Sequence, residues 1–406
     1  MESAITRAFC WSIAKVEKPM RNLLIDKDAP LPLPTRAFTA VNCDVVIAWP
    51  QLPFYAIRCI RRVIEEARWS TALIATPGPC NEEDVERAIP APIRWVRGDC
   101  SCTWETLGVP VPKVFCYTGD FDPVRRWWRR DTVASGFSAL AKAVREKGGK
   151  TICMIDNNRK RTVRQAVGGA VFRFVLREHR NIDAVFVPGI DGGRLMGQFG
   201  FSERKIRKGL YGADPEIFRP GPPLDQRPRD FLFVGQLIER KGIVTLLQAV
   251  EKLRAESINC GLAALGSGPM EAAVRSAGIP VLGFCPPDLV AEEMRKTKFL
   301  VLPSYEEHWG VVVHEAALSG CGLILSDAIG SRHDLLTAEN GFLCKVRDSA
   351  SLACAMRFAL SLKNAELDRC RRVSVDVAAD FGPERFAETL RETVETLMRT
   401  DDVRHA

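Results

Sequence analysis

The segment FLVLPSYEEHWGVVVHEAALSGCGLILSD, residues 299–327, decides the fold because it holds one complete strand, loop, helix and strand. The apolar runs at 299–304 and 322–327 are predicted strands, and residues 310–320 between them form a predicted helix. A strand that returns to its sheet through a helix runs parallel to its neighbour. Such sheets are covered by helices on both faces and bind ligands beyond the carboxyl ends of their strands.

The same alternation continues in both directions from this segment. Further predicted strands lie at 44–50, 71–77, 92–96, 113–119, 151–158, 183–189, 231–237, 260–269 and 280–284. Residues 211–230, rich in Pro, Gly and charge, interrupt the alternation and indicate a link between two domains. We therefore expect an α/β protein of two doubly wound, Rossmann-like domains that face each other across a cleft. The expected parts are an irregular lead-in at 1–40, a first domain at 41–212, a linker at 213–230, a second domain at 231–375 and a C-terminal helix that docks back at 376–406.

The composition excludes several classes of protein. With 46% hydrophobic and 26% charged residues among 406, folded cores are expected and extensive disorder is not. The net charge of +7 is too small to indicate nucleic acid as a partner. The 14 cysteines are mostly scattered through apolar runs, which is typical of reduced thiols in a cytosolic protein. Neither a signal peptide nor a membrane-spanning helix is expected from the sequence.

Two glutamates flank the start of the central predicted helix. This start offers the amides of Gly310, Val311 and Val312 and the positive end of the helix dipole, so a phosphate fits there. Glu315 leans back toward the helix start and suits the hydroxyls of a ribose, whereas Glu307 in the preceding loop suits a second polyol. A phosphate between two such carboxylates describes a nucleotide sugar. The alternative is that Glu307 only favours the helix N-terminus electrostatically and that Glu315 is a solvated helix residue.

A second strand end carries two cations. The run FVGQLIERKG leaves a predicted strand at Gly235 and places Arg240 and Lys241 before its helix. Both cations follow a strand of the same sheet, so they can meet the same diphosphate through charge-assisted hydrogen bonds. A solvated basic turn is the alternative. The glycine-rich turn LGSGP, with Gly266 and Gly268, ends another strand of this sheet, but turns of this kind are common.

Taken together, these residues resemble the retaining glycosyltransferases of GT-B family 4 over a little more than half of the chain. The resemblance rests on GADPEIFRP at 212–220, GSGP at 266–269, the E-x7-E block within 299–327 and NGFL at 340–343, in this order. It implies a GT-B fold and a retaining transfer, of the hexosyltransferase type, from a nucleoside-diphosphate sugar bound mainly by the second domain. It implies no other cofactor and no metal, because cations and a helix terminus supply the positive charge.

The resemblance also assigns roles to single residues. Lys241, helped by Arg240, neutralises the departing diphosphate, and Glu307 holds the sugar hydroxyls, so these three form the expected catalytic group. The expected donor-binding residues are Gly235, Gln236, Gly266, Gly268, Gly310, Val311, Val312 and Glu315. Gln236 departs from the family, which often has Arg directly after the strand glycine, and this departure bears on donor affinity or identity.

The first half of the chain carries weaker signals for the acceptor. It lacks the glycine-rich loop after the first strand and the histidine near the reacting carbon that the family usually has. Asp156, Asn157 and Asn158 follow a predicted strand and are candidates for a polar wall that faces the sugar. An ordinary polar turn between strand and helix is the alternative for these three residues.

Arginine and tryptophan interleave in FDPVRRWWRRD, residues 121–131. The membrane-surface candidates are Arg125, Arg126, Trp127, Trp128, Arg129 and Arg130. Arginine beside tryptophan suits a lipid headgroup layer, and the alternative is that the indoles pack on the sheet while the arginines are solvated. Such a patch would give only weak, peripheral contact with the inner face of a membrane.

We therefore expect a cytoplasmic, metal-independent glycosyltransferase that acts on a saccharide or lipid-linked acceptor in polysaccharide or glycoconjugate synthesis. Two alternatives stay open. The chain could be a GT-B protein that binds nucleotide sugars without turnover, or another GT-B enzyme such as an epimerase.

Overall fold

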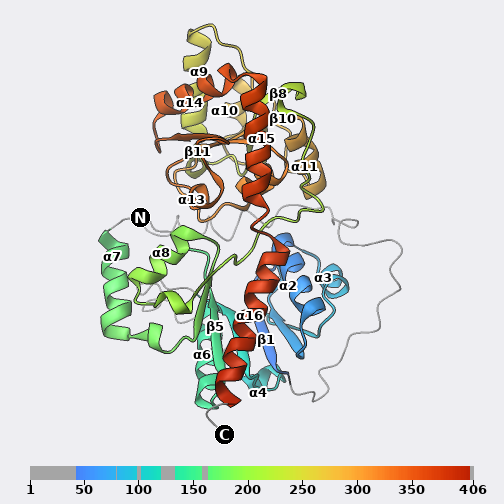
Figure 1. The fold of residues 1–406 in the computed structure, drawn as a ribbon, viewed down its shortest axis with the longest axis vertical. Coiled ribbons are helices and arrows are strands. Elements are labelled where there is room, and N and C mark those ends of the chain that lie inside the picture. The colour runs from blue at the N-terminus through green and yellow to red at the C-terminus, as the bar shows by residue number, and fades with distance from the viewer. Residues whose placement is uncertain (1–42, 79, 98–101, 120–132, 158–162, 403–406) are drawn as a thin grey trace. The chain divides into compact units, whose positions relative to one another are not determined.

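The computed structural model of the chain consists of two parallel sheets with helices between their strands (Figure 1). It describes residues 43–78, 80–97, 102–119, 133–157 and 163–402. The lead-in expected at 1–40, the acceptor-side candidate Asn158 and the arginine and tryptophan run at 125–130 lie outside the described residues. The chain divides into two compact units, with one boundary within strand β5, between Thr151 and Ile152, and another between Thr393 and Val394, so that the C-terminal residues belong to the first unit.

The first sheet has seven strands in the order β3-β2-β1-β4-β5-β6-β7. Its strands are β1 (Val45–Trp49), β2 (Thr71–Ala75), β3 (Ile93–Trp95), β4 (Val114–Thr118), β5 (Lys150–Met154), β6 (Ala184–Val187) and β7 (Ile206–Lys208). Its helices are α2 (Phe54–Glu66), α3 (Glu82–Ala88), α4 (Trp104–Leu107), α6 (Val133–Glu146), α7 (Val163–Ala170) and α8 (Ile190–Gln198). β1 pairs in parallel with β2 and β4, and β6 with β5 and β7.

The second sheet has five strands in the order β12-β11-β10-β8-β9. Its strands are β8 (Arg229–Val234), β9 (Leu262–Leu265), β10 (Thr297–Leu302), β11 (Gly322–Ser326) and β12 (Gly341–Cys344), and all pair in parallel. Its helices are α9 (Ile243–Ala255), α10 (Glu271–Ser276), α11 (Pro287–Arg295), α12 (Val311–Leu318), α13 (Arg332–Leu335), α14 (Ser349–Ser361) and α15 (Asn364–Ala378). The sheets occupy 45–208 and 229–344, which confirms the predicted α/β fold with two Rossmann-like sheets.

Burial along the strands explains why helices cover both faces of each sheet. Every residue of β1 and every residue of β11 is buried, although successive side chains of a strand point to opposite faces. A strand of this kind is stable only where both faces are covered, as in parallel sheets. α9 packs with α14 and α12 packs with α15 around the second sheet, which leaves the carboxyl ends of its strands for loops.

One predicted strand is wrong. Residues 280–284 form only two isolated bridges, Ala264 with Val281 and Gly266 with Gly283, because Gly283 has φ +76° and turns the chain away from an extended course. The sequence pattern also missed the short strands β7 and β12. β7 lies within the charged run ERKIRK at 203–208, and β12 (GFLC) begins with a glycine, so neither is marked by a long apolar run.

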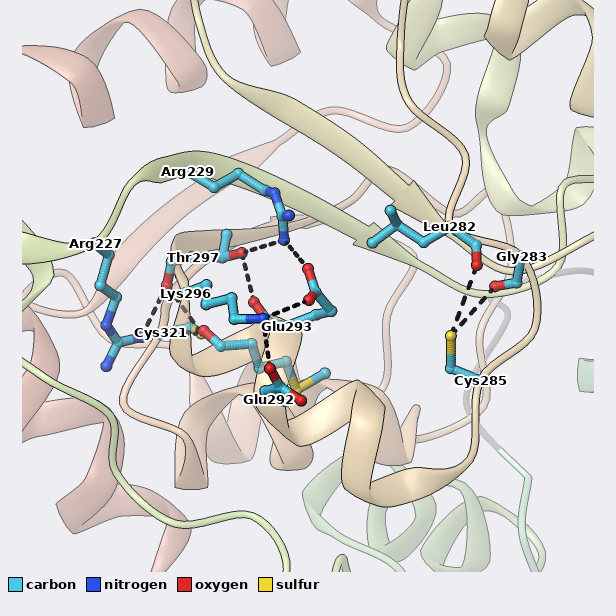
Figure 2. Close-up of polar contacts among 11 residues, drawn as sticks. Arg227, Arg229, Leu282, Gly283, Cys285, Glu292, Glu293, Lys296, Thr297 and Cys321 are labelled. Atoms are coloured by element: carbon cyan, nitrogen blue, oxygen red, sulfur yellow. Dashed lines mark hydrogen bonds and ion pairs between the residues drawn. The ribbon is translucent and has the colours of Figure 1, made fainter. Parts of the chain in front are cut away.

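A buried arginine joins the predicted linker to residues of the second sheet and its helices. Arg227 is 2% exposed, and its guanidinium donates to the carbonyl of Thr297 at 2.8 Å, of Ser319 at 3.0 Å and of Pro222 at 3.0 Å. Figure 2 shows Arg227 pointing toward Thr297 and Cys321, with a separate cluster of ion pairs around Glu293 nearby. Because several carbonyls of different elements share one guanidinium, the linker is fixed to the start of the sheet.

The C-terminal helix α16 (Pro383–Asp402) packs through the apolar face that its sequence predicts. Phe386, Leu390 and Val394 are buried, and the ring of Phe386 stacks on that of Phe186 in β6 with centroids 5.3 Å apart. None of the helices within the described residues combines the length and the apolar character that a membrane crossing requires.

Candidate functional site

Two strand ends of the second sheet bring the expected catalytic residues together. β8 pairs in parallel with β10, so the loops that follow them leave the same edge of the sheet. The first loop runs through a 3-10 turn, Glu239–Lys241, into α9, and the second runs into α12. Across these loops the ammonium of Lys241 forms an ion pair with the carboxylate of Glu307. Lys241 thus lies on the same side of the sheet as the start of α12.

Burial distinguishes the two cations. The side chains of Lys241 and Glu307 are 12% and 15% exposed, whereas Arg240 is 38% exposed and its Nη1 lies 4.0 Å from Oε2 of Glu307. A charge in a drier environment acts more strongly on its neighbours. Lys241 is therefore better placed than Arg240 to act on a negative charge at this edge.

Hydrogen bonds between the two loops hold this geometry. The amide of Tyr305 donates to the carbonyl of Arg240 at 2.7 Å, and Nη1 of Arg240 donates to the carbonyl of Glu306 at 2.7 Å. The hydroxyl of Tyr305 lies 2.9 Å from Oγ1 of Thr245 in α9. These contacts are made by the protein's own groups, and they hold the charged groups of the two loops in place.

Gly310 is the cap residue at the start of α12. Its φ of +85° is one that a side chain disfavours, and a Cβ there would lie 3.0 Å from Cγ of Glu307. The amides of the first helical turn, including Val311 and Val312, have no acceptor within their own helix. Both residues are partly exposed. An anion could therefore approach the backbone beside Glu307, as the sequence predicts.

The glycines at the ends of β8 and β9 are required by the protein's own backbone. A Cβ on Gly266 would lie 1.9 Å from the carbonyl oxygen of Gly235, and one on Gly268 would lie 2.5 Å from that of Leu237. The loops therefore pack against each other too closely for side chains. Gln236, beside them, is exposed. The close packing explains the glycines without a ligand and leaves their donor-binding role a prediction.

His314, inside α12, joins three parts of the chain. The amide of Ala213 donates to its Nδ1 at 2.8 Å, so the proton of the neutral ring is on Nε2, which donates to the carbonyl of Ala378 at 2.9 Å. The residue is fully buried, and burial lowers its pKa to about 4. His314 therefore positions α12, a role that no sequence pattern indicated.

Glu315 follows His314 and is partly buried. Burial raises the pKa of its carboxyl group to about 7, so near neutral pH the group is divided between its two protonation states. The side chain is thus not fully solvated, and its ribose-binding role stays a prediction. A carboxyl group in this state can both donate to and accept from a hydroxyl.

The acceptor-side candidates follow β5 as expected. Oδ2 of Asp156 lies 3.9 Å from Nδ1 of His308, which belongs to the loop that also carries Glu307. Asn157 is partly buried beside it. The structure thus brings Asp156 near the loop between β10 and α12, while Asn158 lies outside the described residues.

Sequence reasoning missed a cluster on α8 and α13. Asp191 is 5% exposed, and its carboxylate lies 3.6 Å from Nη1 of Arg332 and 3.4 Å from Nε2 of His333. Next to it, the carboxylate of Asp334 accepts from the amide of Ile190 and from Nε1 of Trp309, both at 3.0 Å, while burial raises its pKa. The charged run RHD at 332–334 was visible in the sequence, but its partners Asp191 and Ile190 lie more than 100 residues away.

Comparisons with known proteins address the second half of the chain most directly. Residues 214–373 match the family model described as Glycosyl transferases group 1. The glycogen synthase of Mycobacterium tuberculosis (strain CDC 1551 / Oshkosh) is 27% identical over 164 residues, which are 38% of this chain and 39% of that protein. The putative teichuronic acid biosynthesis glycosyltransferase TuaC of Bacillus subtilis (strain 168) is 32% identical over 138 residues, 34% of each chain. The chain thus spans little more than a third of the length of these relatives.

Solved structures extend the likeness to nearly the whole chain. HepE of Anabaena, solved in complex with UDP, aligns with a TM-score of 0.65 at 14% identity, covering 87% of this chain and 100% of that one. The chain has the GT-B fold. This confirms the predicted architecture of two Rossmann-like domains. Within the described residues, no group of three His, Cys, Asp or Glu side chains could hold a metal ion.

Proposed function

We propose that the protein is a retaining glycosyltransferase of the GT-B family 4 type, which moves a sugar from a nucleoside-diphosphate sugar to an acceptor hydroxyl. One observation carries the proposal. Lys241 and Glu307 pair at the start of α12, where a cation, helix-start amides and a carboxylate lie within reach of one ligand. The family model that matches residues 214–373 and the names of the relatives support it.

The donor has a diphosphate, which needs positive charge around it, and a sugar, whose hydroxyls need hydrogen-bond acceptors. This site offers groups of both kinds. When the bond between the anomeric carbon and the diphosphate oxygen breaks, negative charge grows on the departing nucleotide. Lys241, assisted by Arg240 and by the amides of Gly310, Val311 and Val312, stabilises that charge. The acceptor oxygen forms the new bond to the anomeric carbon, and its proton passes to the departing phosphate.

Glu307 binds the hydroxyls of the transferred sugar. A carboxylate so close to a diphosphate would repel it, but its ion pair with Lys241 offsets this repulsion. Glu315 binds the ribose hydroxyls from the second turn of α12. The lysine and the helix terminus supply positive charge at the leaving group, so we propose that the reaction needs no metal.

The acceptor is a saccharide or a lipid-linked glycan, and the product belongs to polysaccharide or glycoconjugate synthesis. Two of the relatives are named for glycogen and for teichuronic acid, which supports glycan synthesis as the setting. Asp156 and Asn157 are the proposed acceptor-side residues, and the donor nucleotide is uridine diphosphate, by analogy with the HepE complex.

A thermal-shift screen tests the donor part of the proposal. Purified protein is melted with nucleoside diphosphates and nucleotide sugars in the presence of a metal chelator. A ligand at 100 times its dissociation constant stabilises the protein by about 2.7 kcal/mol, and we expect uridine nucleotides to raise the melting temperature most. If no nucleotide at millimolar concentration shifts the melting temperature, the proposal is wrong.

Product chemistry tests the remaining part. The stabilising donor is incubated with a panel of saccharide and lipid-linked acceptors, and the anomeric configuration of the product is read by NMR. Retention of configuration with chelator present is expected. Tight donor binding without turnover across the panel would instead support a binding protein, and a new sugar nucleotide without acceptor would indicate an epimerase.

A further inference from the structure

The segment formed by α7 and the π-helix Val171–Leu176 exposes apolar side chains where a surface helix normally exposes polar ones. Val163 is 81% exposed, Val167 57%, Phe174 64%, Val175 72% and Leu176 43%. We call these five side chains the 163–176 face. Five of the twelve exposed large hydrophobic residues in the described chain lie on this one segment, which marks it as an interaction site.

The opposite side of the segment is firmly seated on the protein. Gly168, Gly169 and Phe172 are buried, and a Cβ on Gly169 would lie 2.9 Å from the ring of Phe199. The ring of Phe172 lies 5.3 Å from that of Phe199 and 6.1 Å from that of Phe201. Because glycines allow this close contact with the region around α8, which adjoins α7 in Figure 1, rotation cannot turn the 163–176 face inward.

Cations surround this face. Arg173, Arg177 and Arg180 are exposed. Burial lowers the pKa of His179, and the positive charges of these three arginines and of Lys205 lower it further, so four cations lie near one imidazole. The guanidinium of Arg173 lies 5.1 Å from the ring centre of Phe174. In residues 163–180 the sequence has four arginines against a single glutamate.

We propose that the 163–176 face docks the protein on an anionic lipid bilayer. Its apolar side chains would enter the boundary between headgroups and acyl chains while the surrounding arginines meet lipid phosphates. A second copy of the chain fits less well, because an interface of this face with itself would bring the same positive charges together. The inference does not depend on the proposed sugar transfer.

Vesicle binding by the purified full-length chain tests the proposal. We expect it to sediment with vesicles of mixed phosphatidylglycerol and phosphatidylcholine and much less with phosphatidylcholine alone. The double variant Phe174→Asp with Val175→Asp should lower the partition coefficient about tenfold or more, because charge replaces inserted apolar surface. Arg173→Gln with Arg180→Gln should lower it only for the anionic vesicles, and added salt should remove that difference.

Matched variants on another surface supply the controls. Phe358→Asp in α14 removes a side chain that is 57% exposed, and Arg369→Gln with Arg372→Gln removes two exposed charges from α15. Both should bind vesicles as the parent does, and all variants should keep the parent's melting temperature within a few degrees. The proposal is wrong if the parent protein does not bind anionic vesicles. It is also wrong if the double aspartate variant binds them as well as the parent does. A third outcome would also overturn it: sedimentation velocity shows a dimer, and Phe174→Asp dissociates that dimer. The 163–176 face would then bind a second copy of the chain.

Discussion

The carboxyl ends of β8 and β10 in the second sheet and of β5 in the first hold their polar residues in different ways. Lys241 and Glu307 form a largely buried ion pair, in loops that hydrogen bonds join to each other. Asp156 is 39% exposed, its Oδ2 lies 3.9 Å from the imidazole of His308, and its Oδ1 is buried without a hydrogen-bond partner in the described chain. In the first arrangement the charged groups satisfy each other, whereas the second leaves a polar atom unsatisfied.

This difference matches the roles that we propose, in which the ends of β8 and β10 bind the donor and the end of β5 faces the acceptor. A donor of fixed chemistry can be met by a preorganised set of charges, and the matching family model covers this part of the chain. The acceptor side has weaker sequence signals and looser side-chain contacts. Substitutions should therefore have large effects at the ends of β8, β9 and β10 and small ones after β5.

The largest effect is expected for Lys241→Ala. Loss of one preorganised charge at a departing diphosphate typically lowers the rate about 10² to 10³-fold, and the fold should persist because the residue lies in a loop. The measurement is the initial rate of nucleoside diphosphate release at saturating donor. Lys252→Ala, an exposed lysine of α9, is the matched control and should keep the parent's rate. A Lys241→Ala rate within twofold of the parent would remove Lys241 from the site.

The next largest effect concerns the packing of the glycine loops. In Gly266→Ala the new methyl group would lie 1.9 Å from the carbonyl oxygen of Gly235, at a φ of +140°. The strands would have to separate, so we expect the free energy of unfolding to fall by about 3 kcal/mol. Gly283→Ala places a methyl group at φ +76° with nothing within 4 Å, and should cost only about 1 kcal/mol. Urea titrations of both variants measure the difference, and equal losses would contradict the close-packing explanation.

A third prediction uses two neighbours in α12 whose pH dependences oppose each other. Burial lowers the pKa of His314 from 6.5 to about 4, so the unfolded chain takes up this proton first and stability is lost as pH falls from 6.5 toward 4. Burial raises the pKa of Glu315 from 4.5 to about 7, so its contribution is present below pH 4.5 and is lost as pH rises toward 7. In the parent protein the two effects largely cancel between these limits.

Glu315→Gln should expose the effect of His314. Relative to the parent, the free energy of unfolding of this variant should rise more steeply between pH 4.5 and pH 7, by about 2 to 3 kcal/mol. Urea titrations at both pH values measure this change. Glu251→Gln, at an exposed glutamate of α9, serves as the control and should follow the parent. Parallel pH profiles for Glu315→Gln and the parent would show that Glu315 ionises normally in the folded protein.

Most strands, and the placement of Lys241 and Glu307 at one edge of a sheet, could be predicted from the sequence, for one physical reason. Buried strands of a parallel sheet read as short apolar runs, and the topology brings their carboxyl ends to one edge. The ion pair then follows from which loops leave that edge. The predicted strand at 280–284 failed because one glycine with positive φ outweighed a locally apolar pattern.

Other features of the site could not be predicted because they depend on contacts between distant segments. His314 looks like any polar residue in a helix until Ala213 and Ala378 are brought to its two ring nitrogens. Asp191 meets Arg332 and His333 only in the folded chain. No local periodicity encodes pairs that lie more than 60 residues apart in sequence.

The smallest effect is expected for Asp156→Asn. The substitution keeps the shape of the side chain and removes a charge that is partly exposed and 3.9 Å from His308. Ion pairs of this exposure contribute little, so the free energy of unfolding should change by less than about 0.5 kcal/mol.

Donor affinity in the thermal-shift assay should change less than about twofold, because the buried pair at Lys241 stays intact. If Asp156 faces the acceptor, transfer at low acceptor concentration should fall while donor hydrolysis in water is unchanged. A tenfold loss of donor affinity would instead place Asp156 in the donor site. The proposed separation of donor-binding residues after β8 and β10 from acceptor-side residues after β5 would then be wrong.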